Sequence, residues 1–451
     1  MLRDFFIPDN LQKLPTHALQ QAGVGYESAN LSPAWLKQFT EKFMQPAIGF
    51  EKGAKAWQQR AAKAWSQVAQ EWRNLQFPEA EALLAALEAK TGLSRKMLQE
   101  ALRNHFWNMQ ENVLQSWLAQ VRKDRGPRNL PIAAAYPELV FLVAAGNIPG
   151  VAIHPVVQLS LLGIPTLVKN ASAEPFLLPA ILSSLARHDP EVASRIAALT
   201  WPRDASTLTE AVLAFNPQLA IFGDDETIAN FEERSEQLAG FGDRFSLALV
   251  SPDADEPSLF DNLAYDICMF EQMGCMSPQA ILLLTDDWEK VEHFCQELAN
   301  SMAKMSEKLP IGSRTPAQQA AIQQWRGAYA ACCAAGEKVL LLTSSGTKWT
   351  VVAAENIDLD ERVAYRFARV WPIPSINKAM SILRRYEIQL QALATSLTLD
   401  ETKMFFPQFW GVDTPFVHIV DTFPGSMQKP VFGWMDQNKA WLRLTRALIE
   451  W

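Results

Sequence analysis

The segment LVFLVAAGNIPG, residues 139–150, joins a short apolar run to a turn of glycine, asparagine and proline. Comparable apolar runs recur along the chain at residues 166–168, 219–222 and 245–250, with a weaker strand candidate at 196–201. Stretches with helical periodicity separate them, near residues 150–162, 174–187 and 226–239. This alternation predicts a mostly parallel, doubly wound sheet. Such a sheet binds ligands outside the carboxyl ends of its strands.

A second α/β unit is expected to begin near residue 257. An amphipathic helix leads to Cys275, and it is followed by a strand at 279–284, a helix at 288–305 and strands at 338–343 and 349–353. Upstream, residues 32–122 have a helical composition and end in a charged, helix-breaking linker at 123–128. We therefore expect a helical N-terminal region, two α/β domains and a C-terminal segment that returns to the first domain or to a partner subunit, with bounds 1–128, 129–256, 257–414 and 415–451.

Trp57, Trp65 and Trp72 recur at close to two-turn spacing in the N-terminal region, so they lie along one helix face. Such a stripe is typical of core packing and much less often of a ligand cage.

Composition narrows the class of protein. A chain of 451 residues is long enough for two or three domains. Its formal charge of -8 argues against a nucleic-acid partner. The five cysteines follow neither a disulfide framework nor a zinc-site spacing: Cys268, Cys275, Cys295, Cys332 and Cys333.

The N-terminus lacks the apolar core of a secretory signal. The most apolar stretch, residues 139–168, is interrupted by prolines and polar residues, whereas a membrane span needs about 20 apolar residues without such breaks. We expect a cytoplasmic protein without a membrane span.

Polar residues follow the first two predicted strands. Asn147 can aim a neutral amide donor at an oxyanion, although an asparagine in a turn more commonly bonds its own backbone. Lys169 can hold a ribose hydroxyl or a phosphate at a helix start, and a solvated lysine at a strand end is an equally good interpretation. Ser172 is small and neutral, which leaves room for the 2′-phosphate of NADP.

Gly223 follows the strand candidate at 219–222 and permits close approach of the backbone to a ligand. The dinucleotide fingerprint Gly-x-Gly-x-x-Gly is absent from the whole sequence. A standard Rossmann pyrophosphate loop is therefore not supported.

Cys275 lies in the decapeptide FEQMGCMSPQ, residues 270–279, where a helical segment meets a Ser-Pro turn and a strand. A thiol at such a junction can project into a cleft and act as a nucleophile in acyl chemistry. The alternative is a small buried hydrophobe, which is the usual state of a free cysteine.

Four motifs in this order resemble the long-chain acyl-CoA reductase family of bacterial bioluminescence operons, within the aldehyde dehydrogenase superfamily. They are AGNIPG at 145–150, VKN at 168–170, FGDDET at 222–227 and QMGCMSPQ at 272–279. The tail PGSMQKP at 424–430, with Trp434 and Asp436, is also similar, and the resemblance covers roughly residues 135–445.

The resemblance implies an aldehyde-dehydrogenase-like fold, with a dinucleotide-binding domain at 129–256 and a catalytic domain at 257–414. It implies NADPH-dependent reduction of a fatty acyl thioester, an acyl-CoA or an acyl-protein, to the aldehyde. Cys275 would accept the acyl group, and Asn147 would share the oxyanion with the backbone amide of Cys275. The cofactor would be bound by Gly146, Lys169, Ser172, Gly223 and Thr227. We also expect a homo-oligomer and a partner protein that transfers the acyl group.

The chain departs from the family pattern at three places. Phe241 stands where members usually carry a histidine, which removes a candidate proton donor or CoA contact. Asp224 replaces a serine, and its carboxylate would repel a pyrophosphate unless it caps the following helix. The usual His-Asp-Gly of the tail reads Met-Asp-Gln at 435–437.

Glu271 lies one helical turn before Cys275 and could relay a proton, but a glutamate on the helix surface is the more common case. No counterpart of the general base of aldehyde-oxidising relatives is evident, which favours acyl transfer over hydrolysis. The alternatives are an aldehyde dehydrogenase that runs in the oxidative direction and a non-reducing scaffold or acyl-carrier subunit.

Overall fold

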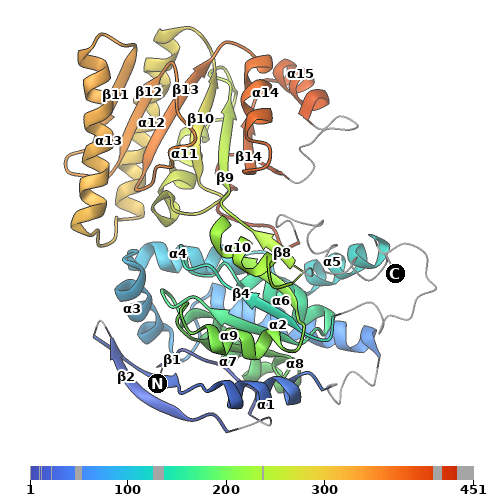
Figure 1. Ribbon diagram of the computed structural model, residues 1–451. Helices are drawn as coiled ribbons and strands as arrows, with labels where there is room; N and C mark the ends of the chain where they lie inside the picture. Colours follow the sequence, from blue (N-terminus) through green and yellow to red (C-terminus); the bar gives the residue numbers. More distant parts are fainter. Residues whose placement is uncertain are drawn as a thin grey trace. The chain divides into compact units, whose positions relative to one another are not determined.

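The computed structural model describes residues 2–9, 11, 13–21, 23–45, 53–124, 137–235, 238–409 and 419–433. These residues form two compact units, each assembled from separate stretches of the chain (Figure 1). The first unit contains the described residues of 1–91, 102–242 and 431–433, and the second contains those of 92–101 and 243–430.

The first unit is built on a five-stranded parallel sheet with the order β6-β5-β4-β7-β8. Its strands are β4 (Val140–Val143), β5 (Thr166–Asn170), β6 (Ile196–Thr200), β7 (Gln218–Phe222) and β8 (Leu238–Phe241). The connecting helices are α6 (Ile153–Leu162), α7 (Leu177–His188), α8 (Pro190–Ala193), α9 (Ser206–Leu213) and α10 (Asp225–Glu232). Strands β4 and β7 are buried along their whole length, as expected for parallel strands covered on both faces.

The N-terminal stretch combines the expected helices with a small sheet. The helices are α1 (Pro33–Phe43), α2 (Ala54–Arg73), α3 (Ala80–Thr91), α4 (Arg95–Phe106) and α5 (Glu111–Asp124). Before them, β1 (Leu2–Arg3), β2 (Thr16–Gln21) and β3 (Val24–Ala29) form a three-stranded sheet that the sequence analysis did not predict. The tryptophans of α2 are buried, and their indole N–H groups donate to α6 and α7, which confirms that this stripe is core packing.

The second unit is built on a seven-stranded sheet with the order β11-β12-β13-β10-β9-β14-β15, in which only the β11–β12 pair is antiparallel. Its strands are β9 (Phe245–Val250), β10 (Pro278–Leu284), β11 (Val339–Thr343), β12 (Thr350–Ala354), β13 (Phe367–Ile373), β14 (Leu390–Ser396) and β15 (Val420–Thr422). Its helices are α11 (Leu259–Cys268), α12 (Trp288–Lys308), α13 (Pro316–Ala334), α14 (Ile376–Arg385) and α15 (Leu399–Phe409), with the short turn η3 (Met269–Gln272) after α11.

Local sequence signals explain several boundaries in this unit. Asp287 caps α12 by accepting from Glu289 N–H. Thr315 and Gln318 form a capping box at the start of α13, with Pro316 in the first turn. Phe245, Leu247 and Leu249 alternate on one face of β9 and join a core cluster that includes residues of α14 and α15.

Three predictions about organisation are corrected by the structure. Residues 245–250 were assigned to the first α/β domain, but β9 pairs with β10 and β14 in the sheet of the second unit. The helix expected at 226–239 ends at Glu232, and Leu238–Phe241 instead form strand β8. Residues 1–91 do not stand apart as a helical domain, because they belong to the same unit as the first parallel sheet.

Candidate functional site

Cys275 lies in the loop between η3 and β10, and its side chain is exposed. Two hydrogen bonds hold the backbone of this loop. Ser246 Oγ donates to the carbonyl of Cys275 at 2.8 Å, and Ser277 N–H donates to the carbonyl of Gly274 at 2.9 Å. The interpretation of Cys275 as a buried hydrophobe is therefore wrong. Buried thiols do occur in this unit, and burial raises the pKa of Cys268 to about 11 and that of Cys295 to about 12.

The turn before Cys275 has an uncommon backbone. Phe270, Glu271 and Gln272 have positive φ values of 52°, 54° and 62°. Residues other than glycine rarely adopt this left-handed region, so three in succession must be held in it by the surrounding structure. The buried Gln272 amide provides one such hold, since it donates to Pro278 O at 2.9 Å and Phe367 O at 3.1 Å and accepts from Phe367 N–H at 2.7 Å.

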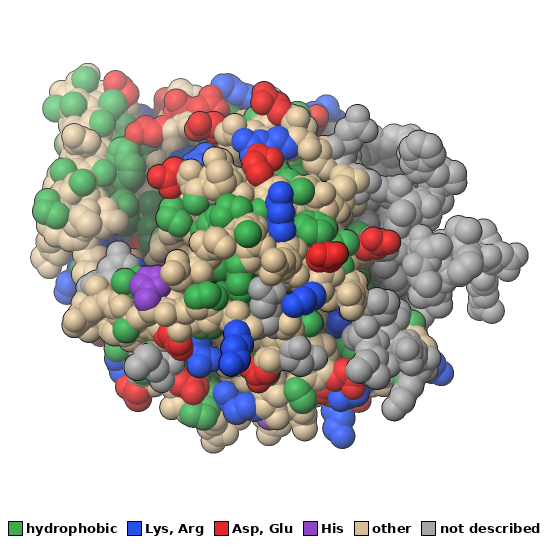
Figure 2. Space-filling model, turned by 60° about the horizontal axis from the view of Figure 1, so that its bottom comes forward, with side chains coloured by type: hydrophobic (Ala, Val, Ile, Leu, Met, Phe, Trp, Pro, Cys, Tyr) green, Lys and Arg blue, Asp and Glu red, His purple; other side chains and the backbone are tan. Residues whose placement is uncertain are grey.

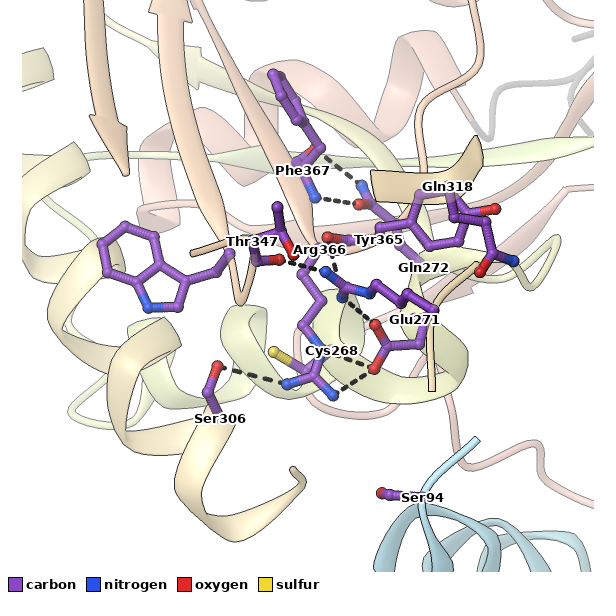
Figure 3. A network of polar contacts seen from close by, with 12 residues as sticks. Ser94, Cys268, Glu271, Gln272, Ser306, Gln318, Thr347, Tyr365, Arg366 and Phe367 are labelled. Carbon is purple, nitrogen blue, oxygen red and sulfur yellow. Dashed lines mark hydrogen bonds and ion pairs between the residues drawn. The ribbon is translucent and has the colours of Figure 1, made fainter. Parts of the chain in front are cut away.

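Glu271 also holds this turn, and the prediction that it lies on a helix surface is wrong. Its side chain is 5% exposed, and its carboxylate forms ion pairs with Arg366, at 2.6 Å, and with Arg314. Figure 3 shows the Arg366 guanidinium directed at the Glu271 carboxylate.

The tail motif at 424–430 packs against the same region of the second unit. Gly425 N–H donates to Asp266 Oδ2 at 2.6 Å, and Gln428 Nε2 donates to Ser277 Oγ at 3.2 Å. Burial raises the pKa of Asp266 to about 8. The motif thus connects α11 to the residue two positions after Cys275. Trp434 and the Met-Asp-Gln tripeptide at 435–437 lie outside the described residues.

Asn147 and Gly146 lie in the first unit, in the exposed turn that follows β4. The turn rests on His105, whose Nε2 is 3.2 Å from the carbonyl oxygen of Pro149. Gly150 has φ +93°, and a Cβ there would collide with the His105 ring. Burial lowers the pKa of His105 to about 4, so the imidazole is neutral near pH 7.

Lys169 is the penultimate residue of β5, and Ser172 follows this strand at the carboxyl edge of the same sheet. The Lys169 ammonium lies 5.6 Å from the centre of the Trp201 ring, and burial lowers its pKa, with a further lowering by the Arg203 guanidinium. Ser172 is exposed, and its hydroxyl donates to Trp201 O at 3.5 Å. Arg203 was missed by the sequence analysis, although its position just after the strand candidate at 196–201 was the available signal.

Asp224 caps helix α10, as the sequence analysis considered. Its carboxylate accepts from Thr227 N–H at 2.7 Å and from the Thr227 hydroxyl, and Arg203 lies 3.8 Å away. The Thr227 hydroxyl bond, followed by the backbone bond, lowers the pKa of Asp224. A Cβ on Gly223 would lie 3.0 Å from Thr227 Cβ, so a larger residue here would have to displace the Thr227 side chain.

Phe241 ends strand β8, where the family pattern has a histidine. Its ring is buried and stacks on Phe222 with centroids 4.2 Å apart. An aromatic pair therefore closes this end of β7 and β8, and neither ring carries an exchangeable proton.

The predicted residues thus fall into two groups. At the carboxyl edge of the first sheet, Lys169 lies near the end of β5, and the others follow strands or lie in the first turn of a helix: Gly146, Asn147, Ser172, Gly223 and Thr227. Cys275 belongs to the second unit. The cations, hydroxyls and small residues at that edge fit a phosphate-bearing ligand.

Comparison with known proteins decides the family. A sequence model of the acyl-CoA reductase (LuxC) family matches residues 50–411. The chain belongs to this family.

Curated relatives in the LuxC family are long-chain acyl-protein thioester reductases. The one from Aliivibrio fischeri is 25% identical over 217 residues, which cover 47% of this chain and 43% of that protein. The one from Vibrio harveyi is 23% identical over 252 residues, which cover 54% and 51%. The chain therefore spans about half the length of the curated relatives it matches.

Solved structures place this LuxC-family chain in the aldehyde dehydrogenase fold. An oxidoreductase from Marinobacter aquaeolei superposes with a TM-score of 0.67 at 12% identity, covering 95% of this chain and 91% of that one. Aldehyde dehydrogenase 21 from Physcomitrella patens superposes with a TM-score of 0.64 at 12% identity, covering 93% and 89%. The predicted fold class is confirmed.

Neither a broad single-sign charge patch nor a membrane-spanning helix is found in the parts of the chain described below. On the described part of the face seen in Figure 2, acidic and basic side chains are interspersed, and no broad area carries a single charge. Within the described residues, no helix combines the length and apolar character required to cross a membrane.

Proposed function

We propose that this protein reduces a long-chain acyl thioester, an acyl-CoA or an acyl-protein, to the fatty aldehyde with NADPH. The observation that carries the proposal is the exposed thiol of Cys275 on a loop fixed at both ends, in a chain of the acyl-CoA reductase (LuxC) family. The curated relatives are named for the same reaction type.

In the proposed reaction the Cys275 thiolate attacks the thioester carbonyl, the bond from that carbon to the donor sulfur breaks, and the donor leaves as a thiol after taking up a proton. The product is an acyl group in thioester linkage to Cys275. Asn147 and the Cys275 backbone amide are proposed to donate hydrogen bonds to the transient oxyanion. When bound, a reduced nicotinamide would supply a hydride to the acyl carbon; the bond from that carbon to Cys275 Sγ would then break, releasing the aldehyde and the Cys275 thiolate.

The cofactor is proposed to lie along the carboxyl edge of the first sheet. Lys169 and Ser172 would face the adenosine ribose, with Gly146, Gly223 and Thr227 nearer the pyrophosphate. Arg203 adds support for a 2′-phosphate, because its guanidinium lies beside Lys169 and Asp224 and its side chain is 66% exposed. The Asp224 carboxylate already accepts from Thr227 and faces Arg203, which offsets part of its repulsion of a phosphate.

Intact-mass spectrometry tests the proposal directly. Incubation with a long-chain acyl-CoA should add one acyl group, located on Cys275 by peptide mapping, and NADPH should then discharge it as aldehyde. Cys333 is also exposed and is a matched control: Cys333→Ala should keep the adduct, whereas Cys275→Ala should lose it.

Parallel incubations distinguish the finer possibilities. An acylated carrier protein in place of acyl-CoA identifies the donor, and NADH in place of NADPH identifies the cofactor. A wild-type protein that takes up no acyl group from either donor, or forms aldehyde equally well after Cys275→Ala, would show the mechanism to be wrong. Formation of acid from aldehyde without CoA would instead favour the oxidative alternative.

A further inference from the structure

Left-handed backbone is concentrated beside the nucleophile. Within the described residues, seven non-glycine residues have positive φ, and five of them belong to two segments, 270–272 and 365–366. These segments contact each other directly, because Tyr365 N–H donates to the carbonyl of Glu271 at 2.6 Å. Uncommon backbone conformations persist only where the surrounding structure imposes them, and they gather at functional sites.

The side chains that join these segments form a buried ionic cluster. Arg366 approaches one carboxylate oxygen of Glu271 through Nε at 3.0 Å and Nη2 at 2.6 Å, while Arg314 Nη2 pairs with the other oxygen. The side chains of Glu271, Arg314 and Arg366 are 5%, 4% and 0% exposed. We name these three residues the Glu271 clamp.

The clamp arginines also donate hydrogen bonds to neighbouring elements. Arg314 donates to Thr347 O, and Arg366 Nη1 donates to Ser306 Oγ of α12 at 3.4 Å. Figure 3 shows these partners arranged around the carboxylate. The Glu271 clamp therefore joins the turn before Cys275 to α12, to β13 and to the β11–β12 connection.

Such a cluster is a poor source of net stability. Desolvation of three charges offsets most of their mutual attraction, and apolar residues of similar volume often stabilise a core as well. A buried ionic cluster is better explained by the unique geometry that it imposes. Here the geometry is that of residues 270–272, three positions before the thiol.

We propose that Glu271, held between Arg314 and Arg366, is a positioning residue for Cys275. The clamp maintains the left-handed turn at 270–272, and this turn, with the Gln272 hydrogen bonds, fixes the direction in which the thiol and backbone amide of Cys275 point. The consequence for acyl transfer rests on the proposed function, and the consequence for loop order does not.

Glu271→Gln tests the clamp with the least change in shape, because the amide keeps one acceptor and loses the charge. Arg314→Lys keeps the charge and loses the forked geometry. Arg195→Gln is the matched control: Arg195 is also buried and donates to Gly163 O and Gln45 O in the first unit, away from the Cys275 loop and the clamp.

Two kinds of measurement distinguish the order of the Cys275 loop from the reactivity of its thiol. Hydrogen–deuterium exchange of a peptide spanning 268–277 should be roughly tenfold faster in E271Q and R314K than in wild type, and unchanged in R195Q. Acylation of Cys275 should slow by about 100-fold in E271Q, because acyl transfer needs thiol and oxyanion donors placed together. Alkylation by iodoacetamide should change by less than about threefold, since it needs only an accessible thiolate.

Unchanged exchange across 268–277 in E271Q would overturn the proposal. So would faster exchange with acylation and alkylation altered by equal factors, because positioning predicts a selective loss of acyl transfer. A wild-type protein without acylation would contradict the proposed function alone, and faster exchange in E271Q would then still support the clamp.

Discussion

At the scale of single residues, two aspartates of this chain have opposite surroundings. Asp224 is exposed, caps α10 and has a lowered pKa because Thr227 donates to its carboxylate. Asp266 is buried, receives Gly425 N–H and has a pKa raised to about 8 by burial. The capping role of Asp224 was predictable from sequence, since Thr227 follows within one turn. The state of Asp266 was not, because it depends on a tail segment about 160 residues away.

The raised pKa of Asp266 predicts a pH dependence of stability. Below pH about 4 the carboxyl is protonated in both states, and between about 4 and about 8 the unfolded state releases a proton that the folded state retains. Stability therefore falls as pH rises through this window, by at most about 1.4 kcal/mol per pH unit. When the pH is raised from roughly 5.5 to roughly 7.5, the melting temperature of Asp266→Asn should fall less than that of wild type.

Asp400→Asn serves as the control for this prediction, because Asp400 is 91% exposed beside Lys403. It should follow the wild-type pH profile. Parallel profiles for wild type and D266N would contradict the assignment of the pH dependence to Asp266.

At the scale of elements, the sequence predicted strands well but not their partners. The apolar runs at 139–145, 166–168 and 219–222 all appear in the first sheet, because parallel central strands carry a strong local pattern. The run at 245–250 has the same pattern and joins the other sheet. Strand β8 was read as helix because residues 226–239 favour a helix locally, and only pairing with β7 selects the strand.

The contact between α2 and α6 gives a prediction at this scale. Trp57 donates to Ser160 O and Trp65 donates to Ser160 Oγ, each at 2.9 Å, in a core where both rings are buried. Ser160→Ala leaves the Trp65 indole N–H without its acceptor, which should cost about 1–3 kcal/mol of the free energy of unfolding.

Calorimetric melting of S160A, W65F and the double variant checks this cost. The double variant should be less destabilised than the sum of the singles, because W65F has already removed the donor that S160A would leave unsatisfied. Additive losses would show that the hydrogen bond does not couple α2 to α6.

At the scale of the whole molecule, the predicted site residues divide between two units. The sequence placed Asn147 after a strand of one sheet and Cys275 before a strand of another, and the structure agrees, whereas Lys169, expected just after a strand, is the penultimate residue of β5. What strand patterns could not provide is the discontinuous course of the chain, in which residues 92–101 join the second unit and residues 431–433 join the first. Long-range packing determines that course, and no local pattern records it. The roles of these residues, a homo-oligomer and an acyl-transferring partner stay predictions.

Cofactor binding decides between a reductase and a non-reducing subunit. Phe241, which stacks on Phe222 where the family pattern has a histidine, is compatible with either function. If the first unit binds NADPH, a concentration about 100 times Kd should add about 2.7 kcal/mol to the free energy of unfolding and raise the melting temperature.

Arg203→Gln should weaken NADPH binding roughly tenfold while leaving NADH binding unchanged, because only the 2′-phosphate gains from that guanidinium. Lys169→Met should weaken the binding of both cofactors, because the proposed binding mode puts that ammonium at the ribose that NADPH and NADH share. Glu210→Gln, which removes the exposed partner of Arg234, is the control and should alter neither. A melting temperature that NADPH and NADH leave unchanged would favour the non-reducing subunit, whereas a shift with both cofactors equally sensitive to R203Q would retain the reductase and contradict the assignment of Arg203 to the 2′-phosphate.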